Sequence, residues 1–141
     1  MKAFFDTSVL VPVFLEDHPH HDASLEAFLQ TDKKRGCCAA HSLAEVYSAL
    51  TRLPGKNRLS AEQALLLLGD LRDHLSMVAL DADEYYAALE ECAAAGIVGG
   101  TVYDALLARC ALKARADTIY TWNLKHFQQL GPEVARRIRT P

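Results

Sequence analysis

Short apolar runs alternate with longer amphipathic stretches along most of this chain. Four runs have the composition of β-strands, at residues 3–5, 37–40, 77–80 and 118–120. A further edge strand is expected near residues 137–140. Helices are expected between the strands, where apolar residues recur at helical spacing or helix caps stand, at residues 6–15, 23–29, 42–53, 60–72, 82–95, 101–116 and 124–130.

This alternation of strands and helices predicts an α/β fold with a central, mainly parallel sheet of four or five strands. Right-handed crossover connections would place helices on both faces of that sheet, giving three layers. The 141 residues suffice for one domain with a hydrophobic core. The pattern shows no internal repeat and no linker, so we expect a single domain over residues 1–141.

Composition narrows the class of protein only slightly. Half of the residues are hydrophobic and 23% are charged, which is typical of a globular protein. The net charge of −3 does not by itself indicate a nucleic-acid-binding protein. No secretory signal and no membrane span are apparent, so we expect a cytoplasmic protein with four buried free thiols, Cys37, Cys38, Cys92 and Cys110.

Four polar residues stand at positions where a parallel sheet gathers its functional groups. Asp6 and Asn123 directly follow expected strands, and Glu45 and Asp104 lie in the first turns of apolar helices. Ligands of such sheets bind beyond the carboxyl ends of the strands. If the strands are parallel neighbours, all four residues could converge there, whereas Asp117 precedes its strand and should lie at the opposite edge.

A cluster of carboxylates at that edge would suit a hard divalent cation. Magnesium prefers oxygen ligands, keeps several waters and needs only one or two carboxylates. A bound cation lowers the pKa of its water and neutralises charge on a phosphate, so the cluster could hydrolyse phosphodiesters.

Each of these residues also has a purely structural interpretation. Asp6 and Asn123 could be helix N-caps. The pairs Ser42/Glu45 and Thr101/Asp104 both fit the capping-box pattern, which would make the two acids ordinary helix-start residues. Asp104, however, shares a helical face with apolar residues, and a carboxylate there is costly unless it is paired or bound to a metal.

Other candidate sites are weaker. His18, His20 and His21 could bind a transition metal, but they lie in a loop with a proline. The basic clusters at 33–35 and 136–139 are short enough to be ordinary surface. The sequence contains no glycine-rich nucleotide-binding motif.

Several short motifs, taken in order, resemble those of PIN domains. They are Asp-Thr-Ser-Val-Leu-Val from Asp6, Ser-Leu-Ala-Glu-Val from Ser42, Tyr-Asp-Ala-Leu-Leu-Ala from Tyr103 and Thr-Trp-Asn-Leu-Lys-His-Phe from Thr121. The length and the segment Asp-His-Pro-His-His resemble the VapC toxins of bacterial and archaeal toxin–antitoxin pairs. The likeness covers nearly the whole chain.

The resemblance implies a magnesium- or manganese-dependent endoribonuclease that leaves a 5′-phosphate and a 3′-hydroxyl. Asp6 and Asp104 match the main metal ligands of the family, and Glu45 matches the acid that completes the site and positions the attacking water. Ser8 and Thr121 match supporting hydroxyls. Many relatives carry Asp where this chain has Asn123, which favours one metal ion over two.

The resemblance also implies an RNA substrate, a homodimer and a small antitoxin that blocks the acidic site. Two alternatives remain open from the residues alone. One is a metal-dependent nuclease that processes RNA or DNA outside a toxin system. The other is a catalytically silent PIN-like module that binds RNA or a protein partner.

Overall fold

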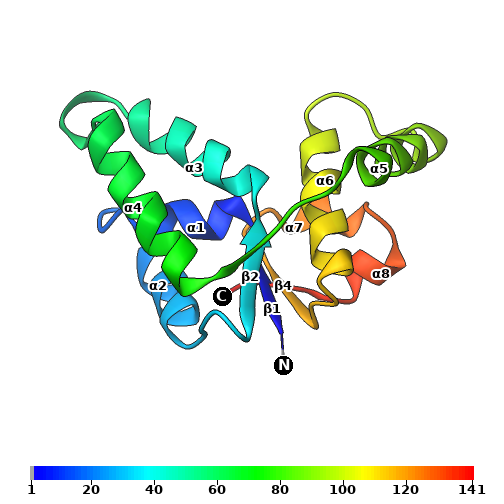
Figure 1. Ribbon diagram of the computed structural model, residues 1–141, viewed down its shortest axis with the longest axis horizontal. Coiled ribbons are helices and arrows are strands. Elements are labelled where there is room, and N and C mark those ends of the chain that lie inside the picture. The colour runs from blue at the N-terminus through cyan, green and yellow to red at the C-terminus, as the bar shows by residue number, and fades with distance from the viewer. Residues whose placement is uncertain (1) are drawn as a thin grey trace.

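The computed structural model describes residues 2–141, which form a five-stranded parallel sheet with helices on both sides (Figure 1). The strands are β1 (Ala3–Phe5), β2 (Gly36–Ala39), β3 (Ser76–Val78), β4 (Thr118–Tyr120) and β5 (Ile138–Arg139). Their order across the sheet is β3-β2-β1-β4-β5, and every adjacent pair is parallel. The predicted three-layer α/β architecture is confirmed, and the first strand of the chain lies at the centre.

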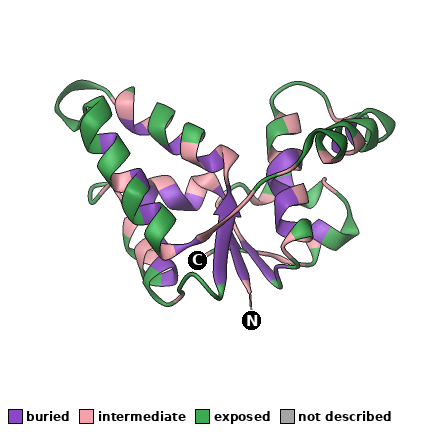
Figure 2. Cartoon of the chain, viewed as in Figure 1, coloured by how far each residue is buried: buried purple, intermediate pink, exposed green. Residues whose placement is uncertain are grey.

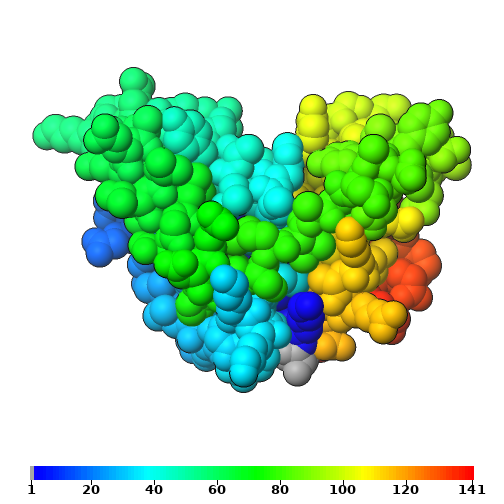
Figure 3. All heavy atoms as spheres, viewed as in Figure 1, coloured from blue at the N-terminus to red at the C-terminus, as the bar shows by residue number. Residues whose placement is uncertain are grey.

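The helices form two groups, one on each side of the sheet (Figure 1). The first group contains α1 (Thr7–Val13), α2 (His21–Leu29), α3 (His41–Thr51) and α4 (Ala61–His74), with the 3-10 turn η1 (Gly55–Asn57) between the last two. The second group contains α5 (Ala82–Ala95), α6 (Thr101–Lys113), α7 (Leu124–Gln128) and α8 (Pro132–Ala135). The space-filling view shows a notch in the outline between the two groups (Figure 3).

Successive side chains of the central strands are buried in alternate cores because both faces of the sheet are covered. Phe4 and Phe5 are both fully buried, but Phe5 packs among the helices of the first group and Phe4 among those of the second. Cys37 and Cys38 divide between the two cores in the same way. The sheet is therefore almost entirely buried between two apolar layers (Figure 2), as expected for parallel strands.

Two of the expected capping boxes are present and two are absent. Ser60 and Asp81 cap α4 and α5 through reciprocal bonds with Gln63 and Glu84. By contrast, α3 begins two residues and α6 one residue too early for the proposed boxes, with Ala40 and Gly100 at their N-cap positions and no side-chain cap bond. The capping interpretation of Glu45 and Asp104 is therefore wrong, which leaves both carboxylates available for other contacts.

The remaining differences from the expected elements are small and local. Helix α6 ends at Lys113 rather than at 116, because the backbone of Arg115 turns through φ 57° into β4. Helix α8 was not predicted, although Gly131 and Pro132 mark its start.

The four cysteines are buried free thiols, as predicted, and burial raises the pKa of Cys37 to about 11 and of Cys38 to about 12. In the part of the chain that the structure describes, no helix has both the length and the apolarity to cross a bilayer.

Candidate active site

Asp6 lies at the centre of the candidate site, where β1 ends at the carboxyl edge of the sheet. Its side chain is only 1% exposed. Its Oδ2 accepts hydrogen bonds from Ser8 Oγ at 2.7 Å and from Thr121 Oγ1 at 2.8 Å. Thr121 directly follows β4, the neighbour of β1, so the sheet itself brings these two residues together. The predicted proximity of these two strand ends is confirmed.

The two hydroxyls also fix the loop that follows β4. Ser8 Oγ accepts a hydrogen bond from the backbone nitrogen of Trp122 at 2.9 Å, and Thr121 Oγ1 accepts one from the backbone nitrogen of Asn123 at 3.0 Å. Each hydroxyl therefore donates to the carboxylate and accepts from the backbone. This arrangement uses both capacities of a hydroxyl and holds the Asp6 carboxylate in one orientation.

Glu45 is linked to the same region through Thr7. Thr7 Oγ1 donates to Glu45 Oε1 at 2.8 Å, and Ser42 Oγ lies 2.8 Å from the same hydroxyl. Thr7 is the residue after Asp6, and Glu45 lies one turn along α3 from the buried Ser42. Packing of α1 against α3 thus places the second carboxylate beside the backbone that carries the first.

Asp104 lies in the first turn of α6, with a side chain that is 19% exposed. His126 of α7 pairs with it, with 3.1 Å between His126 Nδ1 and Asp104 Oδ2. Burial raises the pKa of Asp104, and the contact with His126 opposes that shift. The carboxylate thus lies half-buried on α6 with one polar partner.

The pKa of Asp6 depends on its burial, its two hydroxyl partners and the charge of Asp104. Burial is the largest cause of the raised pKa of Asp6, the bonds from Ser8 and Thr121 lower it, and the charge of Asp104 raises it further. Both carboxyl groups are thus disfavoured as anions in the absence of a cation. A bound cation would reverse this cost, which is the electrostatic property expected of a metal-binding pair.

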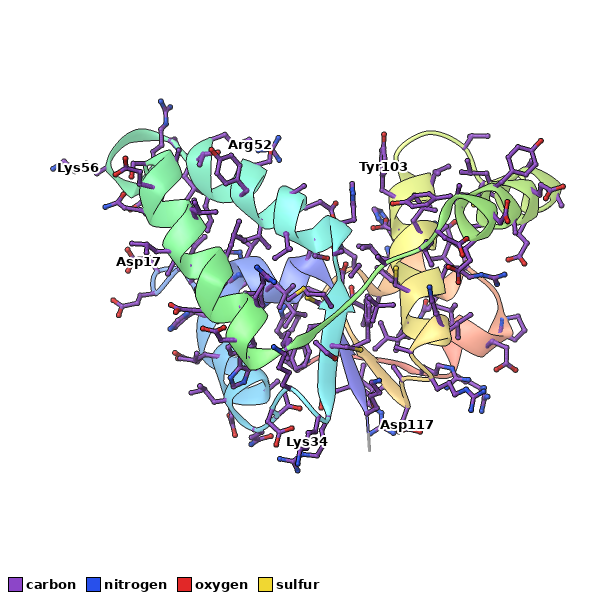
Figure 4. The ribbon with its side chains drawn as sticks, viewed as in Figure 1. Asp17, Lys34, Arg52, Lys56, Tyr103 and Asp117 are labelled. Carbon is purple, nitrogen blue, oxygen red and sulfur yellow. The ribbon has the colours of Figure 1, made fainter. Side chains whose placement is uncertain are left out.

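Asn123 occupies the N-cap position of α7 but makes no side-chain capping bond. Its side chain is exposed, and its contact with the site is the backbone bond to Thr121. Asp117, the acid expected at the opposite edge, accepts a hydrogen bond from the backbone nitrogen of Lys2 at 2.8 Å. Figure 4 shows Asp117 near the start of β1, far from the carboxyl edge, so this expectation is confirmed.

The donor set suits magnesium or manganese, because its charged ligands are hard carboxylate oxygens. Within residues 2–141, however, no three His, Cys, Asp or Glu side chains lie close enough together to form a ready-made metal site. The structure couples Asp6 with Asp104 and holds Glu45 through Thr7. Two carboxylates completed by waters fit a magnesium ion without a third direct ligand.

Three contacts of the site could not be read from the sequence. Thr7 connects Glu45 to the Asp6 segment, although nothing in the sequence pairs these two residues. His126 was not singled out, although it lies in the motif that begins at Thr121. Trp122 donates its indole Nε1–H to Ser24 Oγ at 2.9 Å and stacks on His20 with 3.7 Å between ring centroids. These contacts join segments far apart in sequence.

Comparisons with known proteins agree with this geometry. A family model described as "PIN domain" matches residues 3–131. The ribonuclease VapC40 of Mycobacterium tuberculosis is 37% identical over 115 residues, which cover 81% of each chain. The ribonuclease VapC27 of the same organism is 34% identical over 112 residues, which cover 79% of this chain and 78% of that one.

Two solved structures share the fold at lower sequence identity. The structure of VapBC2 from Rickettsia felis, bound to a DNA fragment from its promoter, matches with a TM-score of 0.67 and 20% identity, covering 99% of this chain and 98% of that chain. The structure of VapC20 from M. tuberculosis, described as a toxin that cleaves the sarcin–ricin loop, matches with a TM-score of 0.71 and 16% identity, covering 89% of this chain and 92% of that chain.

Proposed function

Because this chain belongs to the PIN domain family and is a VapC-type member of it, we propose that it is a magnesium-dependent endoribonuclease and the toxin of a toxin–antitoxin pair. The observation that carries the proposal is the buried Asp6 carboxylate, which two hydroxyls orient and which lies within electrostatic range of Asp104. Burial raises the pKa of Asp6 most and the charge of Asp104 raises it further, and such a buried acid next to a second acid is poorly explained by stability alone.

In this proposal the residues divide the work of phosphodiester hydrolysis. Asp6 and Asp104 hold the metal ion, Ser8 and Thr121 keep Asp6 in its orientation, and Glu45, positioned by Thr7, orients the attacking water. When bound, magnesium or manganese supplies a water of lowered pKa and neutralises charge on the scissile phosphate. Because the Asn123 amide carries no charge, we propose one metal ion rather than two.

The products follow from the direction of attack. Water attacks the phosphorus, and the bond from phosphorus to the 3′-oxygen breaks. The leaving oxygen takes a proton and becomes a 3′-hydroxyl, while the other fragment keeps a 5′-phosphate. The substrate in this proposal is RNA, consistent with the names of the two mycobacterial relatives.

The partners in this proposal are a cognate antitoxin and a second copy of the chain. An acidic pocket that repels RNA phosphates until a cation binds would attract a basic side chain of an inhibitor. The VapBC2 neighbour is described as bound to promoter DNA, so an antitoxin that also binds DNA is a reasonable partner here.

The test is cleavage of total cellular RNA by the protein freed of any antitoxin, in magnesium, in manganese and in EDTA. Asp6→Asn and Asp104→Asn are compared with Asp117→Asn, a matched acid at the opposite edge of the sheet. We expect discrete cleavage that requires metal, disappears in the first two variants and persists in the third. Folded protein that leaves RNA intact with either metal would instead indicate a silent binding module.

A further inference from the structure

Beside the acidic site lies an aromatic pair that the proposed chemistry does not use. His41, the first residue of α3, and Tyr103, in the first turn of α6, have ring planes within 5° of parallel and centroids 6.0 Å apart. The two rings come from opposite sides of the notch between the helix groups. Figure 4 shows Tyr103 at the end of α6 that borders this notch.

Both rings belong to residues that are adjacent in sequence to residues of the candidate site. Tyr103 directly precedes Asp104, and His41 directly precedes Ser42, which contacts Thr7. A group stacked on this pair would therefore lie near the carboxylates. Tyr103 is 54% exposed, so much of its ring is open to a binding partner.

Uncharged contacts with RNA would be useful on this part of the surface. The chain carries a net charge of −3, and the two cations of α6, Arg109 and Lys113, are already paired with Glu91 and Glu84. Stacking of a base on an aromatic ring requires no positive charge and tolerates any base. It does require that the base be unpaired, since a base inside a duplex already stacks on its neighbours.

We propose that Tyr103, backed by His41, is the stacking surface for an unpaired nucleobase next to the scissile phosphate. This inference rests on the proposed ribonuclease function and adds to it a residue that binds the substrate without taking part in the reaction. His41 lies parallel to the phenol ring with 6.0 Å between the centroids, so a base stacked on Tyr103 would lie parallel to both rings. Stacking binds the substrate, whereas the carboxylates perform the reaction.

The experiment measures steady-state cleavage of a single-stranded oligoribonucleotide that spans a site mapped in total RNA. For Tyr103→Ala we expect kcat/KM to fall by about five- to hundred-fold, mainly through KM, because that is the range measured for loss of one base–aromatic stack. Tyr103→Phe keeps the ring and should stay close to wild type. Tyr86→Ala, an exposed tyrosine of α5 outside any aromatic pair of residues 2–141, is the matched control.

A second arm identifies the base without relying on the fold of a variant. Substrates with a single abasic nucleotide at each position near the cut are given to wild type and to Tyr103→Ala. At the stacked position, the losses in cleavage rate caused by the abasic substitution and by Tyr103→Ala should not be additive, because each change removes the same contact. Wild-type cleavage that is equally fast with every abasic substrate, or additive losses at every position, would overturn the stacking site. Failure of wild type to cleave any RNA would instead count against the proposed ribonuclease.

Discussion

Removing the Thr121 hydroxyl is the most direct test of how Asp6 is held. Thr121→Val keeps the shape of a fully buried side chain but deletes the donor to Asp6 Oδ2 and the acceptor for the backbone nitrogen of Asn123. A hydrogen bond to a charged group contributes about 1.5–3 kcal/mol. Because Asp6 is 1% exposed, solvent cannot replace the lost donor.

We therefore expect the free energy of unfolding at neutral pH to fall by about 2 kcal/mol, which lowers Tm by roughly 4–8 °C in a domain of this size. The measurement is thermal and urea unfolding in EDTA, so that metal does not mask the effect. Thr118→Val is the matched control, since Thr118 is also buried in this strand region and makes no side-chain bond to the site. The free energy of unfolding of Thr118→Val should fall by less than half as much as that of Thr121→Val.

The loss should also depend on pH in a defined direction. The pKa of Asp6 is already above its ordinary value of 3.8, and the Thr121 bond is one of the contacts that lower it. The Thr121→Val substitution should raise this pKa further. The loss in free energy of unfolding relative to wild type is therefore complete at a pH where Asp6 is ionised in both proteins. The loss becomes smaller as the pH falls and Asp6 gains a proton. The acid limb of RNA cleavage should move to higher pH. If the stability difference between the variant and wild type did not change with pH, or if the acid side of the pH profile of RNA cleavage did not move, this account of Asp6 would be refuted.

Three further predictions follow from the same contacts. Thr7→Val removes the donor to the half-buried Glu45, and we expect kcat/KM for RNA cleavage to fall about tenfold with little change in Tm. Asp104→Asn removes the charge that raises the pKa of Asp6, so in EDTA the variant should unfold at a higher temperature than wild type while losing metal-dependent cleavage. Gly36→Ala places a Cβ 2.7 Å from Leu75 Cδ2, which should cost about 1–3 kcal/mol in urea unfolding, whereas Gly69→Ala in α4 meets no atom within 4 Å and should add about 0.5–1 kcal/mol.

The fold could be predicted from the sequence because the patterns that mark its strands and helices lie within short segments and recur along the chain. Each strand is a short apolar run, and each long helix shows a stripe or a cap that a window of about ten residues contains. Helix α8 was not predicted because its four residues are too few to show a helical repeat of apolar positions. The start of α3 was misplaced by one residue because Ser42 looks like a cap, whereas α6 begins at Thr101 as expected but without a side-chain cap.

The candidate site was only partly accessible for a different reason. The positions of Asp6 and Thr121 follow from a general property of parallel sheets, so their meeting could be anticipated. The bond from Thr7 to Glu45 and the pairing of His126 with Asp104 depend on how α1 meets α3 and how α6 meets α7. No local pattern encodes those packing angles, and a threonine or histidine in a helix gives no signal of its distant partner.

The central place of the N-terminal strand has a consequence for the timing of synthesis. Asp6 leaves the ribosome early, but Thr121, which holds it, is 115 residues away, and β4 must arrive before the sheet can close around β1. At about 5–20 residues per second, translation of that interval takes roughly 6–23 s. During this time the chain has no assembled acidic site. If the chain is the toxin proposed above, each nascent copy cannot act until β4 has been made, and an antitoxin already present has that time to meet it.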